Sequence, residues 1–414
     1  MTMIRIIADT QSNAHFLESP MEQAYDQRGG LCQIGDEGVL ITANSIDPNF
    51  LSYWAGLGFT LPLLLTAGPS DGTRSLSELI MDRPDIRESI RSHVNGNKAR
   101  LEFFCIEKTE RKLSDYLGIP AYCTFDVAIP YSRKPAGRRL FSKLGLTTPP
   151  GMICSTLHEM KEYVQVSLAR RTELLLKAED GTGGIACNGM HSLKNKSDLD
   201  AILSDPPRLG SEFVVEERID AIHEVSVHWE INEDGTPALI GIFNQHSPNL
   251  GYQGASWPAS IPEKVVRKIT EEVQTIWWPA LLAEFAIGYF CCDIIIDAQG
   301  VHYWIDFNPR KGAIRYVYDL TRRFAQIHFE GHCASFTHEH VKLPNGEKHY
   351  AFSDIRKQLS ELLAPAEDFC IIASNPGVIP FGYVDLTGLC RSEHAEAAMK
   401  DRFAESRQRI ASLP

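Results

Sequence analysis

The chain has 414 residues, of which 43% are hydrophobic and 23% charged, and its formal net charge at pH 7 is −12. This length and composition exclude a fibrous or disordered chain and predict a globular protein with several subdomains. The negative net charge argues against nucleic acid as a partner, because phosphate backbones bind to concentrated basic surfaces.

The sequence contains no apolar run long enough to cross a membrane, and its first residues lack the basic-then-apolar order of an export signal. We therefore expect no membrane partner and a cytoplasmic location. The ten cysteines are scattered and form no CxxC pair, so neither a disulfide framework nor a zinc ribbon is expected.

The first 115 residues alternate strand-like and helical patterns, as an open α/β domain does. The strand-like runs lie at 3–7, 38–42, 59–65 and 101–106, and the clearest helical pattern lies at 75–91. No GxGxxG motif follows the first strand. We therefore expect that this domain does not hold a nucleotide through a dinucleotide fingerprint.

A basic helix is predicted at 133–144, before the turn that ends at Gly151. Its first turns carry Arg133, Lys134, Arg138 and Arg139. Taken alone, such a cluster is most simply interpreted as a solvated helix face.

The next strand, predicted at 173–178, ends in Lys177 and opens into a glycine-rich turn that contains Gly181, Gly183 and Gly184. Glycines let backbone N–H groups approach phosphate oxygens closely, and a lysine at the base adds a compact positive charge. A tight hairpin turn explains the loop equally well when it is considered alone.

A strand predicted at 212–217 ends in Glu216 and Glu217 and is followed by Arg218 and Ile219, with Glu224 further along. Such a strand exit can offer backbone donors and acceptors to an adenine edge, and a nearby carboxylate can accept hydrogen bonds from ribose hydroxyls. Strands at 224–231 and 237–243 follow, joined by a turn at Asp234-Gly235, and helical periodicity extends over 261–285.

The strongest chemical pattern is a hairpin predicted from strands at 290–296 and 301–307. Asp293 lies on its first strand, and Asp306 and Asn308 lie at the end of the second, so alternate side chains can meet on one face. Two carboxylates and an amide oxygen suit Mg²⁺. A polar hairpin at a sheet edge is the alternative interpretation.

The order of these segments resembles the ATP-grasp superfamily over about residues 125–325: a basic helix, a strand with a lysine and a glycine loop, an acidic strand exit, and the acidic hairpin. One position departs from the family pattern, which commonly has glutamate where this chain has Asp306. The resemblance implies that Lys134 and Lys177 contact ATP phosphates and that the loop from Gly181 to Gly184 closes over them.

The resemblance also assigns the remaining site residues. Glu216 or Glu217, with the backbone of Arg218 and Ile219, would line the adenine, and Glu224 would hold the ribose. Asp293, Asp306 and Asn308 would bind one or two Mg²⁺, with Mn²⁺ as an alternative. Arg310 would reach the γ-phosphate or the acyl phosphate, so the implied catalytic residues are Arg310 and Lys177.

The fold implied is α/β (α+β): a pre-ATP-grasp domain at 1–115, an ATP-grasp domain of two lobes clamping ATP at 116–325, and a small C-terminal α+β domain at 326–414. Helices at 352–363 and 393–405 and a strand at 369–373 are predicted in the last part. Within the superfamily, this layout resembles the peptide and amino-acid ligases of the pheganomycin ligase group. In that group, the C-terminal domain shapes the acceptor site.

The activity implied is an ADP-forming ligase that joins a small-molecule carboxylate to an amine, an amino acid or peptide, through an acyl phosphate. Two alternatives stay open: a ligase that loads an amino acid onto the thiol of a carrier protein, and an ATP-binding regulatory protein without turnover. A homodimer is the default oligomeric state.

Overall fold

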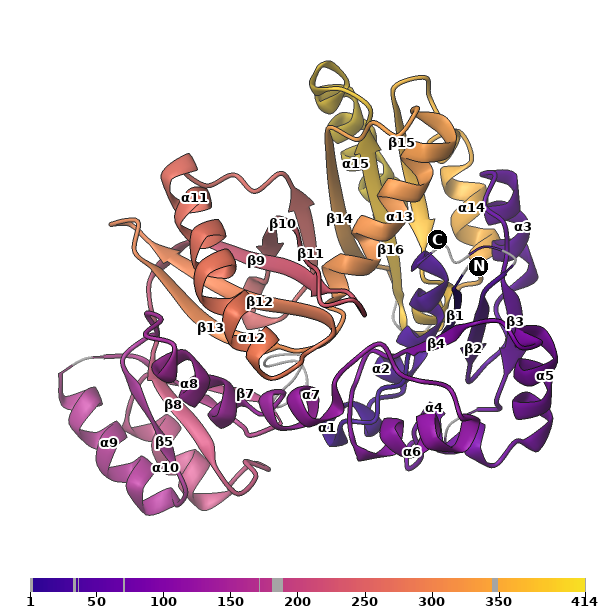
Figure 1. Ribbon diagram of the computed structural model, residues 1–414. Coiled ribbons are helices and arrows are strands. Elements are labelled where there is room, and N and C mark those ends of the chain that lie inside the picture. Colours follow the sequence, from indigo (N-terminus) through magenta and orange to yellow (C-terminus); the bar gives the residue numbers. More distant parts are fainter. Residues whose placement is uncertain are drawn as a thin grey trace.

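The computed structural model describes residues 3–32, 35, 37–69, 71–170, 172–180, 189–344 and 349–413. Within these residues the strands form three sheets: one parallel sheet of four strands, one antiparallel sheet of four strands and one sheet of eight strands. Figure 1 shows the small antiparallel sheet at lower left and the parallel sheet at lower right, and the eight-stranded sheet extends from the left of the picture to its upper part.

The N-terminal sheet is parallel, with strand order β3-β2-β1-β4, and confirms the predicted open α/β domain. Its two central strands, β2 and β1, are buried on both faces, as expected of a parallel sheet covered by helices. The strands are β1 (Ile4–Ala8), β2 (Val39–Thr42), β3 (Leu63–Thr66) and β4 (Ala99–Glu102). The helical segments are α1 (Ala14–Leu17), α2 (Pro20–Gln23), η1 (Ala24–Cys32), α3 (Pro48–Gly56), α4 (Leu76–Met81), α5 (Pro84–Val94) and α6 (Lys108–Leu117).

The helix predicted at 75–91 is divided into α4 and α5. Pro84 is the first residue of α5, and a proline disfavours helical geometry in the residue before it. Ser75 forms a capping box with Glu78 at the start of α4, where the sequence pattern begins.

The small lobe is the antiparallel sheet with order β5-β8-β6-β7, together with the helices α9 and α10, which pack on one of its faces. Leu174, Leu176 and Val215 point into that helical layer, so alternation turns Lys177 and Glu216 to the opposite face. The elements of this region are α7 (Phe125–Tyr131), α8 (Lys134–Lys143), β5 (Gly151–Cys154), α9 (Leu157–Ala169), β6 (Leu174–Lys177), β7 (Met190–Leu193), α10 (Lys196–Ser204) and β8 (Phe213–Glu217).

Gly151 holds β5 close to β8, because a Cβ at this position would lie 2.4 Å from the carbonyl oxygen of Val215 and 2.6 Å from Cα of Glu216. We expect Gly151→Ala to lower the free energy of unfolding by roughly 1–3 kcal/mol, since the backbone of β8 would have to shift. Urea unfolding measures this change. Gly56→Ala is the matched control, because its Cβ would meet nothing within 4 Å; an equal loss in both variants would contradict the prediction.

The large sheet begins with a meander and has the order β13-β12-β9-β10-β11-β14-β16-β15. The predicted turn at Asp234-Gly235 joins β9 to β10, and Gly235 has a φ of 81°. The elements are β9 (Ala221–Ile231), β10 (Pro237–His246), η3 (Pro248–Leu250), β11 (Gly254–Trp257), α11 (Glu263–Glu272), the π-helical turn η4 (Val273–Trp277), α12 (Trp278–Ala283), β12 (Gly288–Asp297) and β13 (His302–Asn308).

One face of this meander packs on α11, η4 and α12, where Trp229, Trp277, Trp304 and Ile294 are almost completely buried. Alternation therefore turns Asp293, which follows Cys292 and precedes Ile294, to the other face. The helices cover the apolar face of the meander, and the candidate site lies on its polar face.

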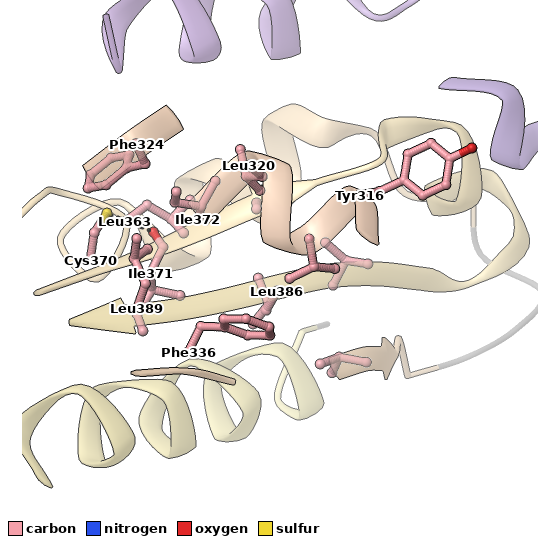
Figure 2. Packing of buried hydrophobic residues seen from close by; sticks show 14 of the residues in the cluster. Tyr316, Leu320, Phe324, Phe336, Leu363, Cys370, Ile371, Ile372, Leu386 and Leu389 are labelled. Atoms are coloured by element: carbon pink, nitrogen blue, oxygen red, sulfur yellow. Dashed lines mark hydrogen bonds between the residues drawn. The ribbon is translucent and has the colours of Figure 1, made fainter. Parts of the chain in front are cut away.

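Residues after 325 continue the same sheet, because β14 pairs with β11 across the boundary predicted at 325/326. The elements are α13 (Ala313–His328), β14 (Ser335–Lys342), α14 (Phe352–Leu359), β15 (Phe369–Ser374), η5 (Pro376–Phe381), β16 (Tyr383–Cys390), η6 (Glu393–Ala395) and α15 (Glu396–Ala411). Figure 2 shows Leu320 and Phe324 of α13 in the same apolar cluster as Ile371, Leu386 and Leu389 of these strands.

The N-terminal and C-terminal parts share one apolar core, and Trp54 of α3 donates its indole N–H to the carbonyl oxygen of Ala373, 3.3 Å away. None of the helices in the described ranges has the length and apolar character needed to cross a membrane.

Asp26 of η1 is buried against β2, where it accepts the backbone N–H of Ala43 at 2.5 Å. Burial raises its pKa to about 7, although the Ala43 hydrogen bond opposes this. A group whose pKa is raised on folding stabilises the folded state below its ordinary pKa, and this contribution is lost as pH rises through about 7.

We therefore expect this group to lower the stability of the protein by up to about 1.4 kcal/mol per pH unit as pH rises from its ordinary pKa of 3.8 to about 7. Asp26→Asn keeps an oxygen for Ala43 and should flatten the slope in urea unfolding across this range. The exposed Asp205→Asn should leave the slope unchanged. A slope in Asp26→Asn equal to that of the wild type would show the prediction to be wrong.

Candidate active site

The predicted acidic hairpin is present as β12 and β13. Asp293 lies directly opposite Asp306, and Cys291 lies opposite Asn308, so the two aspartates and the asparagine share one face. The amide nitrogen of Asn308 is 3.5 Å from Oδ2 of Asp293, and Gln245 donates to Oδ1 of Asp293 at 3.0 Å. The structure therefore brings together all three predicted metal ligands.

A register shift between Asp293 and Ile294 makes Ile305 an extra residue in β13, a β-bulge beside Asp306. The Ile305 carbonyl accepts a hydrogen bond from Nζ of Lys177 at 3.3 Å. This hydrogen bond at the bulge connects the hairpin to the end of β6.

Two predicted lysines converge on Asp306. Nζ of Lys134, at the start of α8, is 2.5 Å from Oδ2, and Nζ of Lys177, at the end of β6, is 3.6 Å from Oδ1. The backbone N–H of Lys134 also donates to the carbonyl of Glu179 at 2.9 Å, which joins α8 to the exit of β6. A compact cluster of opposite charges therefore forms where the small lobe meets the large sheet.

The two aspartates respond differently to this environment. Burial raises the pKa of Asp293, and the neighbouring Asp306 raises it further. Burial opposes ionisation of Asp306 too, but Lys134 and Lys177 hold its pKa below the ordinary value. Two carboxylates side by side favour a divalent cation, which would remove their repulsion.

The residues present fit magnesium by donor type, since all three predicted ligands offer oxygen. In the part of the chain that the structure describes, no three His, Cys, Asp or Glu side chains gather as a metal-ligand set. The third predicted ligand, the amide oxygen of Asn308, accepts a hydrogen bond from Arg310 at 3.2 Å.

Glu216, predicted to line the adenine, is buried and forms ion pairs with Lys177 at 2.6 Å and with Arg138 at 2.8 Å. Arg138 also donates to the carbonyl of Pro149 at 2.6 Å. The basic cluster of α8 is therefore more than a solvated helix face, because Arg138 forms an ion pair with Glu216, and Glu216 in turn forms an ion pair with Lys177. Sequence reasoning missed this link, although the residues were all noted.

The backbone N–H groups near the predicted adenine edge are engaged in the sheet. Glu217 donates to Pro150 at 2.7 Å and Arg218 to Glu173 at 2.9 Å, and Ile219 lies between β8 and β9. Adenine contacts of these residues stay a prediction.

Glu224, predicted to hold ribose, lies opposite Ile295 of β12, two residues from Ser226, which lies opposite Asp293. Burial raises its pKa, and Asp293 contributes in the same direction, while Ser247 and Arg218 oppose the shift. Glu224 is thus close to the acidic hairpin and on the same face of the sheet.

Arg310 follows the hairpin, and its Cζ lies 4.2 Å from the ring centroid of Phe104, beyond the end of β4. The sequence analysis did not identify Phe104 as a residue of the site. The two residues link the hairpin to the N-terminal domain.

Gly181, Gly183 and Gly184 lie outside the described residues. Asp180, just before them, pairs with Arg133 at 2.6 Å, and its carbonyl accepts a hydrogen bond from Asn13 at 3.3 Å. The exit of β6 is therefore anchored to both α8 and the N-terminal domain.

No family model matches the sequence, and no curated protein matches it. Solved structures do match. The structure of N5-carboxyaminoimidazole ribonucleotide synthetase from Thermus thermophilus has a TM-score of 0.58 at 14% identity, covering 99% of both chains. The biotin carboxylase–beta-gamma-ATP complex from Campylobacter jejuni has a TM-score of 0.63 at 13% identity, covering 99% of this chain and 94% of that one.

The biotin carboxylase domain of Hydrogenobacter thermophilus 2-oxoglutarate carboxylase, solved with MgADP, ADP and bicarbonate, has a TM-score of 0.61 at 13% identity. It is matched over 98% of this chain and 90% of that one. At these identities the similarity establishes the fold, and the predicted α/β ATP-grasp fold is confirmed.

Proposed function

We propose that the protein is an ATP-dependent ligase that joins a carboxylate to an amine through an acyl phosphate and releases ADP and phosphate. One observation carries the proposal: Lys134 and Lys177 converge on Asp306, which lies opposite Asp293. Positive charge suited to a triphosphate and oxygen ligands suited to its metal thus meet between the small lobe and the large sheet, which we propose to clamp ATP.

In this proposal, Asp293, Asp306 and Asn308 hold one or two Mg²⁺, or Mn²⁺, which when bound neutralises phosphate charge. Lys134 and Lys177 bind phosphate oxygens and exchange part of their contact with Asp306 for them. The loop with Gly181, Gly183 and Gly184 covers the phosphates. Glu216 or Glu217, with the backbone of Arg218 and Ile219, borders the adenine, and Glu224 binds the ribose.

The proposed reaction requires little covalent chemistry from the protein itself. The carboxylate attacks the γ-phosphorus in line, and ADP leaves. The amine then attacks the carbonyl carbon of the acyl phosphate, and Arg310 stabilises the oxyanion before phosphate leaves. Two observations support Arg310 in this role: it hydrogen-bonds Asn308, and it borders the N-terminal domain through Phe104.

The finer proposal is an amino-acid or peptide ligase of the pheganomycin type, with residues 326–414 contributing to the acceptor site. It rests on the layout of the motifs and on the close packing of this segment against the N-terminal domain. We further propose a soluble, cytoplasmic enzyme that acts as a homodimer.

Release of ADP and phosphate from Mg-ATP, measured across amino acids singly and in pairs, tests the proposal. Turnover that depends on particular acids and yields amide products supports it. Turnover only with an added carrier protein would identify the thiol-loading alternative, and ATP binding without hydrolysis across both panels would favour a regulatory protein.

A further inference from the structure

A buried guanidinium lies beside the candidate site with its hydrogen-bonding capacity largely unused. Arg28 of η1 is 7% exposed, and its Nε and Nη2 have no hydrogen-bond partner among the described residues. Oδ2 of Asp9 lies 3.6 Å from its Nε, and Glu22 and Asp26 also interact electrostatically with the guanidinium. Burying N–H groups of a charged side chain without hydrogen bonds is unfavourable, so Nε and Nη2 of Arg28 are suited to donate to an additional anion.

Aromatic rings hold this guanidinium in position. Cζ of Arg28 lies 3.9 Å from the ring centroid of Phe104, 4.8 Å from that of Tyr316 and 5.1 Å from that of Tyr25. Tyr316 donates its hydroxyl to Oδ1 of Asp9 at 2.6 Å, and Figure 2 shows this hydroxyl directed away from the apolar core around α13. Rings hold a cation without using its N–H groups, which stay available to a ligand.

The location connects Arg28 to the reacting atoms. Arg28 and Arg310 share the ring of Phe104, and their distances from its centroid, 3.9 and 4.2 Å, place the two Cζ atoms within about 8 Å of each other. Tyr252 provides a second connection: burial raises the pKa of its phenol, Asp385 and Asp293 raise it further, and Arg28 lowers it. The phenol oxygen of Tyr252 likewise lacks a hydrogen-bond partner among the described residues.

We propose that Arg28 binds the carboxylate of the amine substrate, which makes this substrate a free α-amino acid. The inference rests on the proposed function, in which the amine attacks an acyl phosphate beside Arg310. Because Arg28 and Arg310 lie so close together, the amine and the anion of the substrate must be separated by a short spacer. An α-amino acid, with one carbon between the two groups, meets this requirement, and a guanidinium binds carboxylate in two parallel hydrogen bonds.

Calorimetric titration of the full-length protein, saturated with Mg²⁺ and a non-hydrolysable ATP analogue, tests this inference. The probes are the twenty L-α-amino acids and, for each that binds, its α-amide. We expect at least one acid to bind and its amide to bind about 10- to 100-fold more weakly, because the amide loses hydrogen bonds to a charged group. This comparison uses the wild-type protein and needs no variant to fold.

Variants then assign the effect to Arg28. Arg28→Gln should abolish the preference for the acid over the amide, Arg28→Lys should retain part of it, and the exposed Arg267→Gln should leave it unchanged. The unfolding midpoint of each variant verifies its fold.

The inference is overturned if no amino acid binds to the nucleotide-loaded protein, if acid and amide bind equally, or if folded Arg28→Gln keeps the preference. A protein that neither binds the nucleotide analogue nor hydrolyses Mg-ATP would contradict the proposed function itself. Nucleotide binding without amino-acid binding would contradict this inference alone.

Discussion

Replacing Asp306 with asparagine is expected to lower kcat/KM for ATP turnover by roughly 10³-fold, within the range found when one strong electrostatic contact to the transition state is removed. The carboxylate of Asp306 is the point where Lys134, Lys177 and the acidic hairpin meet. Asparagine keeps the shape of the side chain but removes the negative charge. The metal would lose a charged ligand, and the two lysines would lose the anion that holds them in position.

Coupled measurement of ADP release gives this result directly, with Asp205→Asn as the control for the same change of residue on an exposed part of the small lobe. Asp306→Glu, which introduces the residue common in the ATP-grasp superfamily, should keep measurable turnover because it keeps a carboxylate. Wild-type turnover in folded Asp306→Asn would remove Asp306 from the proposed site.

Replacing Glu102 with glutamine is expected to lower the free energy of unfolding by about 3–5 kcal/mol, the cost of breaking a buried ion pair from one side. Glu102 is 3% exposed at the end of β4. Arg5 binds both of its oxygens, at 2.7 and 2.8 Å, and Arg100 lies at 3.1 Å and Lys311 at 3.8 Å. In the variant, Arg5, Arg100 and Lys311 would lose the negative charge that they share. Lys311 would still pair with Asp319, 2.8 Å away.

Urea unfolding at pH 7 measures this loss. Glu405→Gln is the control, because Glu405 pairs with Arg409 on an exposed helix surface, where such a pair contributes about 0.3–0.5 kcal/mol. A similar small loss in both variants would show that the Glu102 network contributes no more than a surface pair.

The same network predicts the acid sensitivity of the fold. Burial opposes ionisation of Glu102, but Arg5, Lys311 and Arg100 hold its pKa below the ordinary value. A lowered pKa means that the stabilisation is present above the ordinary pKa of the group and is lost as pH falls through the folded-state value. This direction is opposite to that of Asp26, whose contribution is lost as pH rises.

The local features of the candidate site follow from the sequence. Period-two alternation and a short turn suffice to place Asp293, Asp306 and Asn308 on one face of a hairpin. Lys177 was predictable as the end of an apolar strand. These features depend on residues close together in the chain, where backbone geometry determines which side chains meet.

Other features depend on tertiary structure. The sequence contains Glu216, Arg138 and Lys177 on three separate elements, and only the packing of α8 against the small lobe makes them one network. Likewise, β14 joins β11 across a predicted domain boundary, because strand partners are chosen by long-range packing.

Arg28 illustrates the difference most clearly. By itself, the sequence determined the apolar strand that ends in Lys177 and the acidic hairpin, since each is a pattern of neighbouring residues with one physical period. The class of fold followed from the resemblance of the motif order to the ATP-grasp superfamily. Only the tertiary structure decided that Arg28 is buried among Tyr25, Phe104 and Tyr316. Those contacts join distant segments of the chain, and no local spacing encodes which side chains meet when separate layers pack together.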